Sequence, residues 1–143
     1  MLRHLTHLGG ARVTIALPVL LVAVDGERRL GLAMLIANAI SHLAVQVLKR
    51  LVQRPRPCDA AGHTLAAIPI PDPYSFPSGH AAAATALALT ASVMHSWLAP
   101  AALLVAGLVG ASRVLLRVHH LSDVLAGAAL GAAGAILAVR LVL

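Results

Sequence analysis

The sequence is short of charged and aromatic side chains. Only 11% of its 143 residues are charged, and tryptophan, tyrosine and phenylalanine occur once each. So few charges could not cover the surface of a water-soluble domain of this size, which excludes a soluble globule. So few aromatic rings leave little for bases to stack on, and most basic residues sit at the ends of apolar segments. We therefore expect no nucleic-acid partner, although Lys and Arg outnumber Asp and Glu by 11 to 5.

Cysteine is also scarce, and apolar residues dominate the composition. Cys58 is the only cysteine, which excludes an internal disulfide and says little about the redox compartment. Apolar residues make up 59% of the chain, against about 45–50% in soluble proteins, and the mean hydropathy is +0.89. These values indicate a membrane protein with one domain, residues 1–143. We expect its N-terminal stretch to be retained rather than cleaved as a signal peptide, because Arg12 and Pro18 interrupt the apolar run.

Five apolar segments are candidates for membrane spans and predict an all-α, integral-membrane helical bundle of about five transmembrane helices. They are expected at about residues 12–24, 30–48, 79–97, 101–116 and 121–143. The proline-rich segment 49–78 separates the second span from the third. Alternating passage through the membrane puts this segment, the N-terminus and residues 113–120 on one face. Most of the unusual polar residues therefore gather on that face, and we expect 49–78 to be an active-site loop.

Some small and polar residues within the spans have structural explanations. Gly127 and Gly131 form a G-x-x-x-G pair, which predicts close approach of the last helix to a neighbour. Asn38, His42 and Gln46 lie in the second span, where a polar side chain suggests either a packing hydrogen bond or a path for a head group. Packing is the preferred interpretation.

His119 and Asp123 form the first group of residues that could carry chemistry. They are four residues apart, so on a helix they share a face and can touch. A carboxylate that holds one imidazole nitrogen leaves the other free to act as nucleophile or base. The alternative is an aspartate that only starts a helix, beside an incidental histidine. The pair alone does not decide between these interpretations.

Residues 77–80, Pro-Ser-Gly-His, form a second group at the point where the third span begins. A helix N-terminus presents free N–H groups and a positive dipole end, both of which suit an anion. Gly79 allows the backbone to approach that anion closely. Ser78 suits an N-cap, which is its structural explanation. His80 is positioned to give a proton to a departing oxygen.

Lys49, Arg56 and Arg113 supply positive charge on the same face. A transferring phosphoryl group spreads negative charge over three oxygens, and arginine can bind such oxygens in a forked way. Arg54-Pro55 is a second Arg-Pro pair beside Arg56-Pro57, which leaves the register of the motif open. Ordinary snorkelling at helix ends is preferred for the other arginines, namely Arg3, Arg12, Arg28, Arg29, Arg50, Arg54, Arg117 and Arg140.

Together the three groups resemble the three signature motifs of the type 2 phosphatidic acid phosphatase superfamily. K-x-x-x-x-x-x-R-P is matched from Lys49 to Pro57, P-S-G-H by residues 77–80, and S-R-x-x-x-x-x-H-x-x-x-D by residues 112–123. The apolar spans point to the membrane lipid-phosphatase branch. Membrane members usually have six spans, with the first motif after the third, whereas here it follows the second. This departure predicts either a shortened chain or a bundle completed as a homo-oligomer.

The resemblance implies a two-step hydrolysis of a lipid phosphate or diphosphate without metal or cofactor. In that scheme His119 attacks phosphorus to give a phosphohistidine, Asp123 holds its ring, and His80 protonates the leaving lipid oxygen. Water then releases phosphate. The implied phosphate ligands are Lys49, Arg56, Ser78, Gly79 and Arg113.

The same resemblance implies a lipid phosphate substrate, membrane lipids as surroundings, and a multi-pass protein of the bacterial inner membrane. Polyprenyl phosphates or diphosphates, phospholipid phosphates and prenyl-linked phosphosugars all fit, with polyprenyl substrates preferred. The positive-inside tendency favours a cytoplasmic site, whereas the resemblance implies an external one, and both stay open.

Two other classes of function compete with a phosphatase. A small transporter-like bundle without catalysis predicts charges at midplane positions, whereas the candidate residues gather at one face. A metal site is suggested by eight histidines, but the only His-x-x-His pair, His4 and His7, has no carboxylate close behind it. The cations near His119 would repel a metal ion and attract phosphate.

Overall fold

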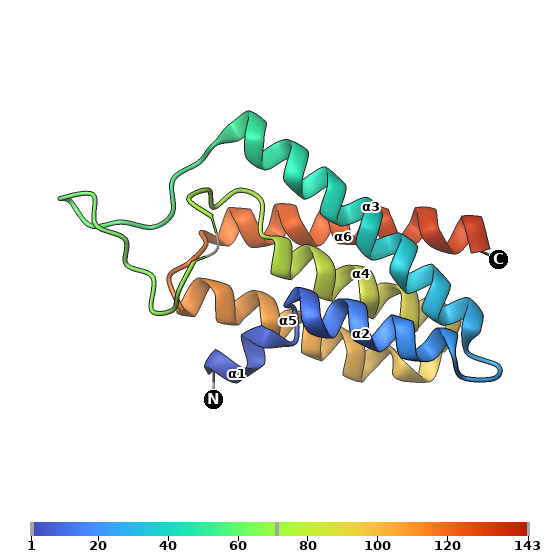
Figure 1. Ribbon diagram of the computed structural model, residues 1–143. Coiled ribbons are helices and arrows are strands. Elements are labelled where there is room, and N and C mark those ends of the chain that lie inside the picture. The colour runs from blue at the N-terminus through green and yellow to red at the C-terminus, as the bar shows by residue number, and fades with distance from the viewer. Residues whose placement is uncertain (1, 71, 143) are drawn as a thin grey trace.

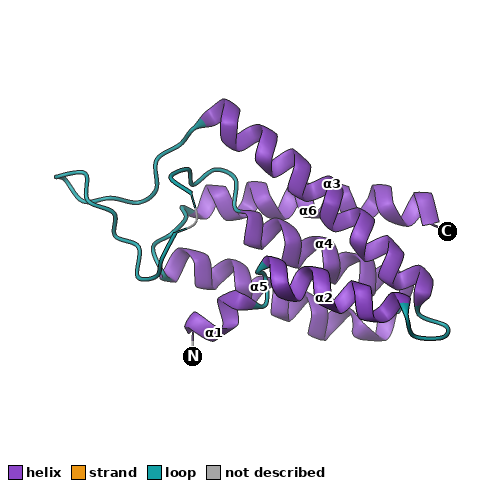
Figure 2. Ribbon diagram, viewed as in Figure 1, coloured by secondary structure: helices purple, strands orange, loops and turns teal. Residues whose placement is uncertain are grey.

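The computed structural model describes residues 2–70 and 72–142, and this part of the chain is helical without a β-strand. In order, the elements are α1 (Leu2–His7), α2 (Ala11–Val22), α3 (Arg28–Val52), α4 (Gly79–Met94), the 3-10 turn η1 (Ser96–Leu98), α5 (Ala99–Leu115) and α6 (Leu121–Val142) (Figure 1). Figure 2 shows only helices joined by loops. The all-α prediction is confirmed. The expected domain of residues 1–143 extends one residue beyond the described chain at each end, and its bounds stay a prediction.

Five apolar helices correspond to the five expected spans. α3, the segment Ser96–Leu115 and α6 are long and apolar enough to cross a membrane, and α2 and α4 are shorter apolar helices. α3 continues to Val52 and ends at Gln53, whose backbone is left-handed. The loop therefore begins four residues later than expected, and Lys49 lies on the last turn of a helix.

The glycines of α6 allow it to pack directly on α4. A Cβ at Gly127 would collide with the carbonyl oxygen of Ser78, and one at Gly131 with that of Ala82. A Cβ at Gly134 would lie 2.7 Å from the carbonyl oxygen of Ala37 in α3. The predicted close approach of the G-x-x-x-G pair is confirmed, and it places the start of α6 beside the start of α4.

A proline in α2 explains one polar residue of α3. Pro18 lacks an N–H group, so the carbonyl of Thr14 has no helical donor. The Nδ2 of Asn38 donates to that carbonyl at 3.1 Å, which joins α3 to α2. The packing interpretation is therefore confirmed for Asn38.

The polar segments gather at one end of the bundle, as the alternation of spans predicts. The N-terminus, the long loop before α4 and the α5–α6 connection lie at the left end in Figure 1, and the C-terminus and the α2–α3 turn lie at the right. At the right end, His95 and Glu27 approach to 2.9 Å and link two turns. The left end holds the candidate site.

Candidate active site

A cavity of about 740 Å³ lies between α2, α3 and α4 and reaches the loop residues Arg56 and Asp72. Six of the eight residues predicted for the site line it, namely Lys49, Arg56, Gly79, His80, Arg113 and His119. The structure thus brings together residues that the chain separates by as many as 70 positions. Ser78 and Asp123 are fully buried behind this wall.

Lys49 and Arg56 meet at the carboxylate of Asp72. The Nζ of Lys49 donates to both carboxylate oxygens, at 2.8 and 2.7 Å, and Nη2 of Arg56 lies 3.3 Å from one of them. Nε of Arg56 donates to the main-chain carbonyl of Asp72 at 2.9 Å, and Nη1 to that of Val118 at 2.7 Å. Both cations are thus held in place, with a carboxylate between them.

Charge and burial act in opposite directions on this cluster. Burial opposes ionisation of Asp72, but the hydrogen bond and charge of Lys49, with the charge of Arg56, bring the pKa of Asp72 below its ordinary value. Burial also lowers the pKa of Arg56, and the charge of Asp72 acts against that shift. Asp72 is therefore a carboxylate at neutral pH, in a place where other anions would also be attracted.

Arg113 enters the cavity from the last turn of α5. Its Nη1 donates to the hydroxyl of Thr6 in α1 at 2.6 Å. Its Nε is buried and has no hydrogen-bond partner among the described residues. A buried donor without a partner is costly, which suits a site that completes its bonds when an anion enters.

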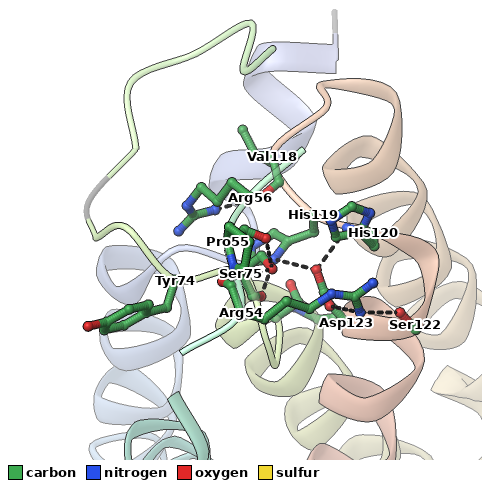
Figure 3. A network of polar contacts seen from close by, with 12 residues as sticks. Arg54, Pro55, Arg56, Tyr74, Ser75, Val118, His119, His120, Ser122 and Asp123 are labelled. Atoms are coloured by element: carbon green, nitrogen blue, oxygen red, sulfur yellow. Dashed lines mark hydrogen bonds and ion pairs between the residues drawn. The ribbon is translucent and has the colours of Figure 1, made fainter. Parts of the chain in front are cut away.

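His119 presents one nitrogen as a base. Its Nδ1 lies 2.6 Å from the main-chain carbonyl of Ser75 (Figure 3). Because a carbonyl only accepts, Nδ1 carries the proton and Nε2 keeps its lone pair. Burial, with the charges of Arg56 and Arg113, lowers the pKa of His119 to about 3. The ring is therefore neutral at pH 7.

Asp123 lies behind His119 and has other direct partners. One of its carboxylate oxygens is 3.7 Å from Nδ1 of His119, beyond a hydrogen bond. The carboxylate accepts from the main-chain N–H of His120 at 2.8 Å, as the third residue of a helix does in a capping box. Asp123 therefore starts α6 and also faces the histidine, whose ring is held by the carbonyl of Ser75 and not by this carboxylate. A role of Asp123 in the reaction stays a prediction.

Arg54 corrects one sequence-based interpretation. Ordinary snorkelling was the preferred explanation, but its Nη1 lies 2.9 Å from Asp123 and 2.7 Å from the hydroxyl of Ser122 (Figure 3). The snorkelling interpretation of Arg54 is wrong, because the loop carries it to a buried carboxylate that hydropathy does not reveal. Of the two Arg-Pro pairs, it is the arginine of the second, Arg56, that lines the cavity.

The start of α4 is arranged as a cap beside the cavity. The hydroxyl of Ser78 accepts from the N–H of Ala81 at 3.4 Å, and its own N–H donates to the carbonyl of Asp123 at 2.9 Å. Gly79 and His80 line the cavity, and their main-chain N–H groups have no partner in the described chain. The N-cap explanation of Ser78 is confirmed, and a contact between Ser78 and phosphate stays a prediction.

Three contacts of the site were not anticipated from the sequence. Asp72 was not among the predicted site residues, although an acidic residue within the expected active-site loop was an available signal. Ser75 acts through its carbonyl, which no side-chain pattern reveals. Thr6 reaches Arg113 from 107 residues away, in an N-terminal segment for which no site residue was predicted. Within the described residues no group of three or more histidine, cysteine or acidic residues could hold a metal ion.

Comparison with known proteins places the chain in a family. Residues 28–143 match the model of the PAP2 superfamily. The chain is 36% identical over 135 residues to a decaprenylphosphoryl-5-phosphoribose phosphatase of Mycobacterium tuberculosis, covering 91% of this chain and 72% of that protein. It is 32% identical over 128 residues to an undecaprenyl-diphosphatase of Sulfolobus acidocaldarius, covering 89% of this chain. The matched region spans 62% of the Sulfolobus protein.

Solved structures with the same fold support the comparison. A transmembrane PAP2 type phosphatidylglycerolphosphate phosphatase from Bacillus subtilis has a TM-score of 0.80 at 29% identity, covering 98% of this chain and 74% of that one. LpxE from Aquifex aeolicus also has a TM-score of 0.80, at 25% identity, covering 97% and 83%. With the apolar helices, these likenesses make the chain an integral membrane protein.

Proposed function

The chain belongs to the PAP2 superfamily, and from this we propose that it is a membrane phosphatase that hydrolyses a lipid phosphate or diphosphate and releases inorganic phosphate. The observation that carries the proposal is the neutral His119, with Nε2 unprotonated, in a cavity that also holds Lys49, Arg56 and Arg113. A nucleophile beside three cations suits a phosphorus centre that carries negative charge.

In the first step His119 Nε2 attacks phosphorus, so that an N–P bond forms as the bond from phosphorus to the lipid oxygen breaks. His80 gives its proton to that oxygen, so the leaving group is a lipid alcohol or, from a lipid diphosphate, a lipid monophosphate. The carbonyl of Ser75 and the carboxylate of Asp123 stabilise the positive charge that develops on the His119 ring.

In the second step water attacks the phosphohistidine, the N–P bond breaks, and inorganic phosphate is released. Neutral His80 accepts the proton of that water and is restored to its acid form. Lys49, Arg56 and Arg113 bind the phosphate oxygens in both steps. The free N–H groups of Gly79 and His80 add to this binding, and Ser78 holds them in position as the cap of α4.

We place the protein in a bacterial inner membrane. Three of the relatives named above come from bacteria, namely Mycobacterium tuberculosis, Bacillus subtilis and Aquifex aeolicus. Association with a second copy stays a prediction from the sequence. The molar mass of the detergent-purified protein tests it.

Phosphate release by detergent-purified protein, with EDTA present, tests the proposed function. The panel contains phosphatidic acid, phosphatidylglycerol phosphate, and polyprenyl mono- and diphosphate. We expect release that survives EDTA, disappears in His119→Ala and persists in His120→Ala, a matched variant at the neighbouring histidine. Release that is equal in the unchanged protein and in His119→Ala would contradict the proposal.

A further inference from the structure

Two polar side chains of α3, His42 and Gln46, line the cavity below Lys49. The spacings of four and three residues put all three on one face of the helix. With the rise of an α-helix, Gln46 lies about 4.5 Å and His42 about 10 Å from the level of Lys49, toward the middle of the bundle. A lipid tail that runs from a phosphate at Lys49 toward the middle of the bundle would pass this face of the helix.

Packing does not account for these two side chains. Asn38, one turn further along, is explained by the Thr14 carbonyl that Pro18 leaves open. By contrast, the only polar contact of His42 and Gln46 in the described chain is with each other, at 3.3 Å between Nε2 atoms. His42 is exposed and Gln46 half-exposed on a helix that crosses the membrane. Polar groups in such a position are costly, and in membrane helices they commonly mark a binding site or a pathway.

The pair offers one donor and one acceptor to a ligand. An amide nitrogen only donates, so Nε2 of His42 accepts from Gln46 and its Nδ1 carries a proton. That Nδ1–H and the Oε1 of Gln46 have no partner among the residues described. A hydroxyl group both donates and accepts, so neighbouring hydroxyls satisfy this pair.

The cavity wall changes character along α3. It is cationic at Lys49, polar at Gln46, His42 and Asn38, and apolar at Leu35, about two turns below His42. A ligand that matches this order has a phosphate, then a hydroxylated linker, then a hydrocarbon tail. A polyprenyl monophosphate would instead place hydrocarbon against the polar pair.

We propose that His42 and Gln46 form a head-group subsite that binds hydroxyl groups of a linker between the scissile phosphate and the lipid tail. The inference rests on the proposed phosphatase function of the same cavity. It assigns the substrate to the phosphate esters of a hydroxylated linker, either a sugar or a glycerol. It also replaces the sequence-based preference for substrates whose phosphate is attached directly to a polyprenyl chain.

The test compares kcat/KM for phosphate release from four lipids by detergent-purified protein. A prenyl-linked 5-phosphoribose and phosphatidylglycerol phosphate carry the hydroxylated linker as a sugar and as a glycerol. Polyprenyl monophosphate and phosphatidic acid lack linker hydroxyls. The variants are His42→Leu, Gln46→Leu and the double variant, because leucine is compatible with a helix that crosses a membrane. Leu43→Ala is the control, because Leu43 is on the same helix, 67% exposed and outside the cavity lining.

We expect the unchanged protein to prefer one hydroxylated lipid, and the better of the two identifies the linker. The double variant should lower kcat/KM for that lipid by about tenfold or more, because hydrogen bonds to its linker are lost. The values for polyprenyl monophosphate and phosphatidic acid should not change. Equal losses on all four lipids, no loss on any, or a preference for polyprenyl monophosphate would overturn the subsite. Release that His119→Ala does not reduce would instead overturn the phosphatase function.

Discussion

The Nδ1–H of His119 donates to the main-chain carbonyl of Ser75 at 2.6 Å, while the nearest carboxylate oxygen of Asp123 is 3.7 Å away. The loop before α4 therefore orients the imidazole directly. Asp123 stabilises the ring through its charge and through the start of α6, where it binds the N–H of His120. These two partners should differ in their effect on the reaction.

Substitution of Asp123 should be less severe than substitution of His119. Without its nucleophile, His119→Ala should lose about 10³-fold or more in kcat. Asp123→Asn removes a charge behind the ring but keeps the Ser75 contact, so we expect a loss of about 10–100-fold, as for other groups that orient a catalytic residue. Steady-state phosphate release measures both. Asp59→Asn, at a loop aspartate that binds His63, is the control. Equal losses in the two site variants would show that Asp123 carries the orientation alone.

Arg54→Gln should lower kcat without a matching change in KM. Arg54 pairs with the buried carboxylate of Asp123 and does not line the cavity, so its loss disturbs the charge behind His119 but not the phosphate ligands. We expect kcat to fall by about tenfold, at the lower end of such indirect effects. Arg50→Gln, at an exposed arginine of the same region, should leave both constants unchanged. A rise in KM alone would show that Arg54 binds phosphate.

Much of this site follows from hydropathy and spacing. The order of the five apolar runs, which alternate in direction, places the starts of α4 and α6 at one end of the bundle, and the fixed spacings then bring His80, Arg113 and His119 together. The rest depends on the irregular path of the loop. Arg54 and Arg56 occupy similar Arg-Pro pairs, and only the folded loop sends one to Asp123 and the other into the cavity. The Ser75 contact uses a carbonyl that any residue would supply.

Asp72→Asn should strengthen the binding of phosphate-like anions. The carboxylate of Asp72 holds Lys49 Nζ at 2.7 Å and Arg56 Nη2 at 3.3 Å, the same groups that a phosphate needs. Neutralising it leaves more positive charge in the cavity, whereas Arg56 keeps its bond to the main-chain carbonyl of residue 72. We expect the inhibition constant of orthovanadate to fall by about twofold to fivefold, a change typical of one partly exposed charge. Weaker inhibition would mean that Asp72 mainly positions the two cations.

Acidification should destabilise the protein through His119. Its pKa is lowered to about 3 in the folded protein, against about 6.5 in an unfolded chain. Between these values the unfolded state binds a proton that the native state excludes, so stability is full above about pH 6.5 and falls toward pH 3. Thermal unfolding in detergent between about pH 7 and pH 4 should show a smaller loss for His119→Gln than for the unchanged protein. His63→Gln, at an exposed histidine, should keep the original slope, and identical slopes in all three would refute the assignment.

Thr6→Val should weaken phosphate binding through Arg113. The Thr6 hydroxyl is the partner of Arg113 Nη1 at 2.6 Å, and Nε of the same guanidinium already has none among the described residues. Valine keeps the shape of threonine but removes the acceptor, so the buried guanidinium loses the contact that aims it into the cavity. A hydrogen bond to a charged group is worth about 1.5–3 kcal/mol, and we expect orthovanadate inhibition to weaken by about tenfold or more. Thr6→Ser should restore it, and Thr64→Val, at an exposed loop threonine, should not change it. If orthovanadate inhibits Thr6→Val as strongly as the unchanged protein, α1 does not position Arg113, and the short N-terminal helix serves only to cover the bundle.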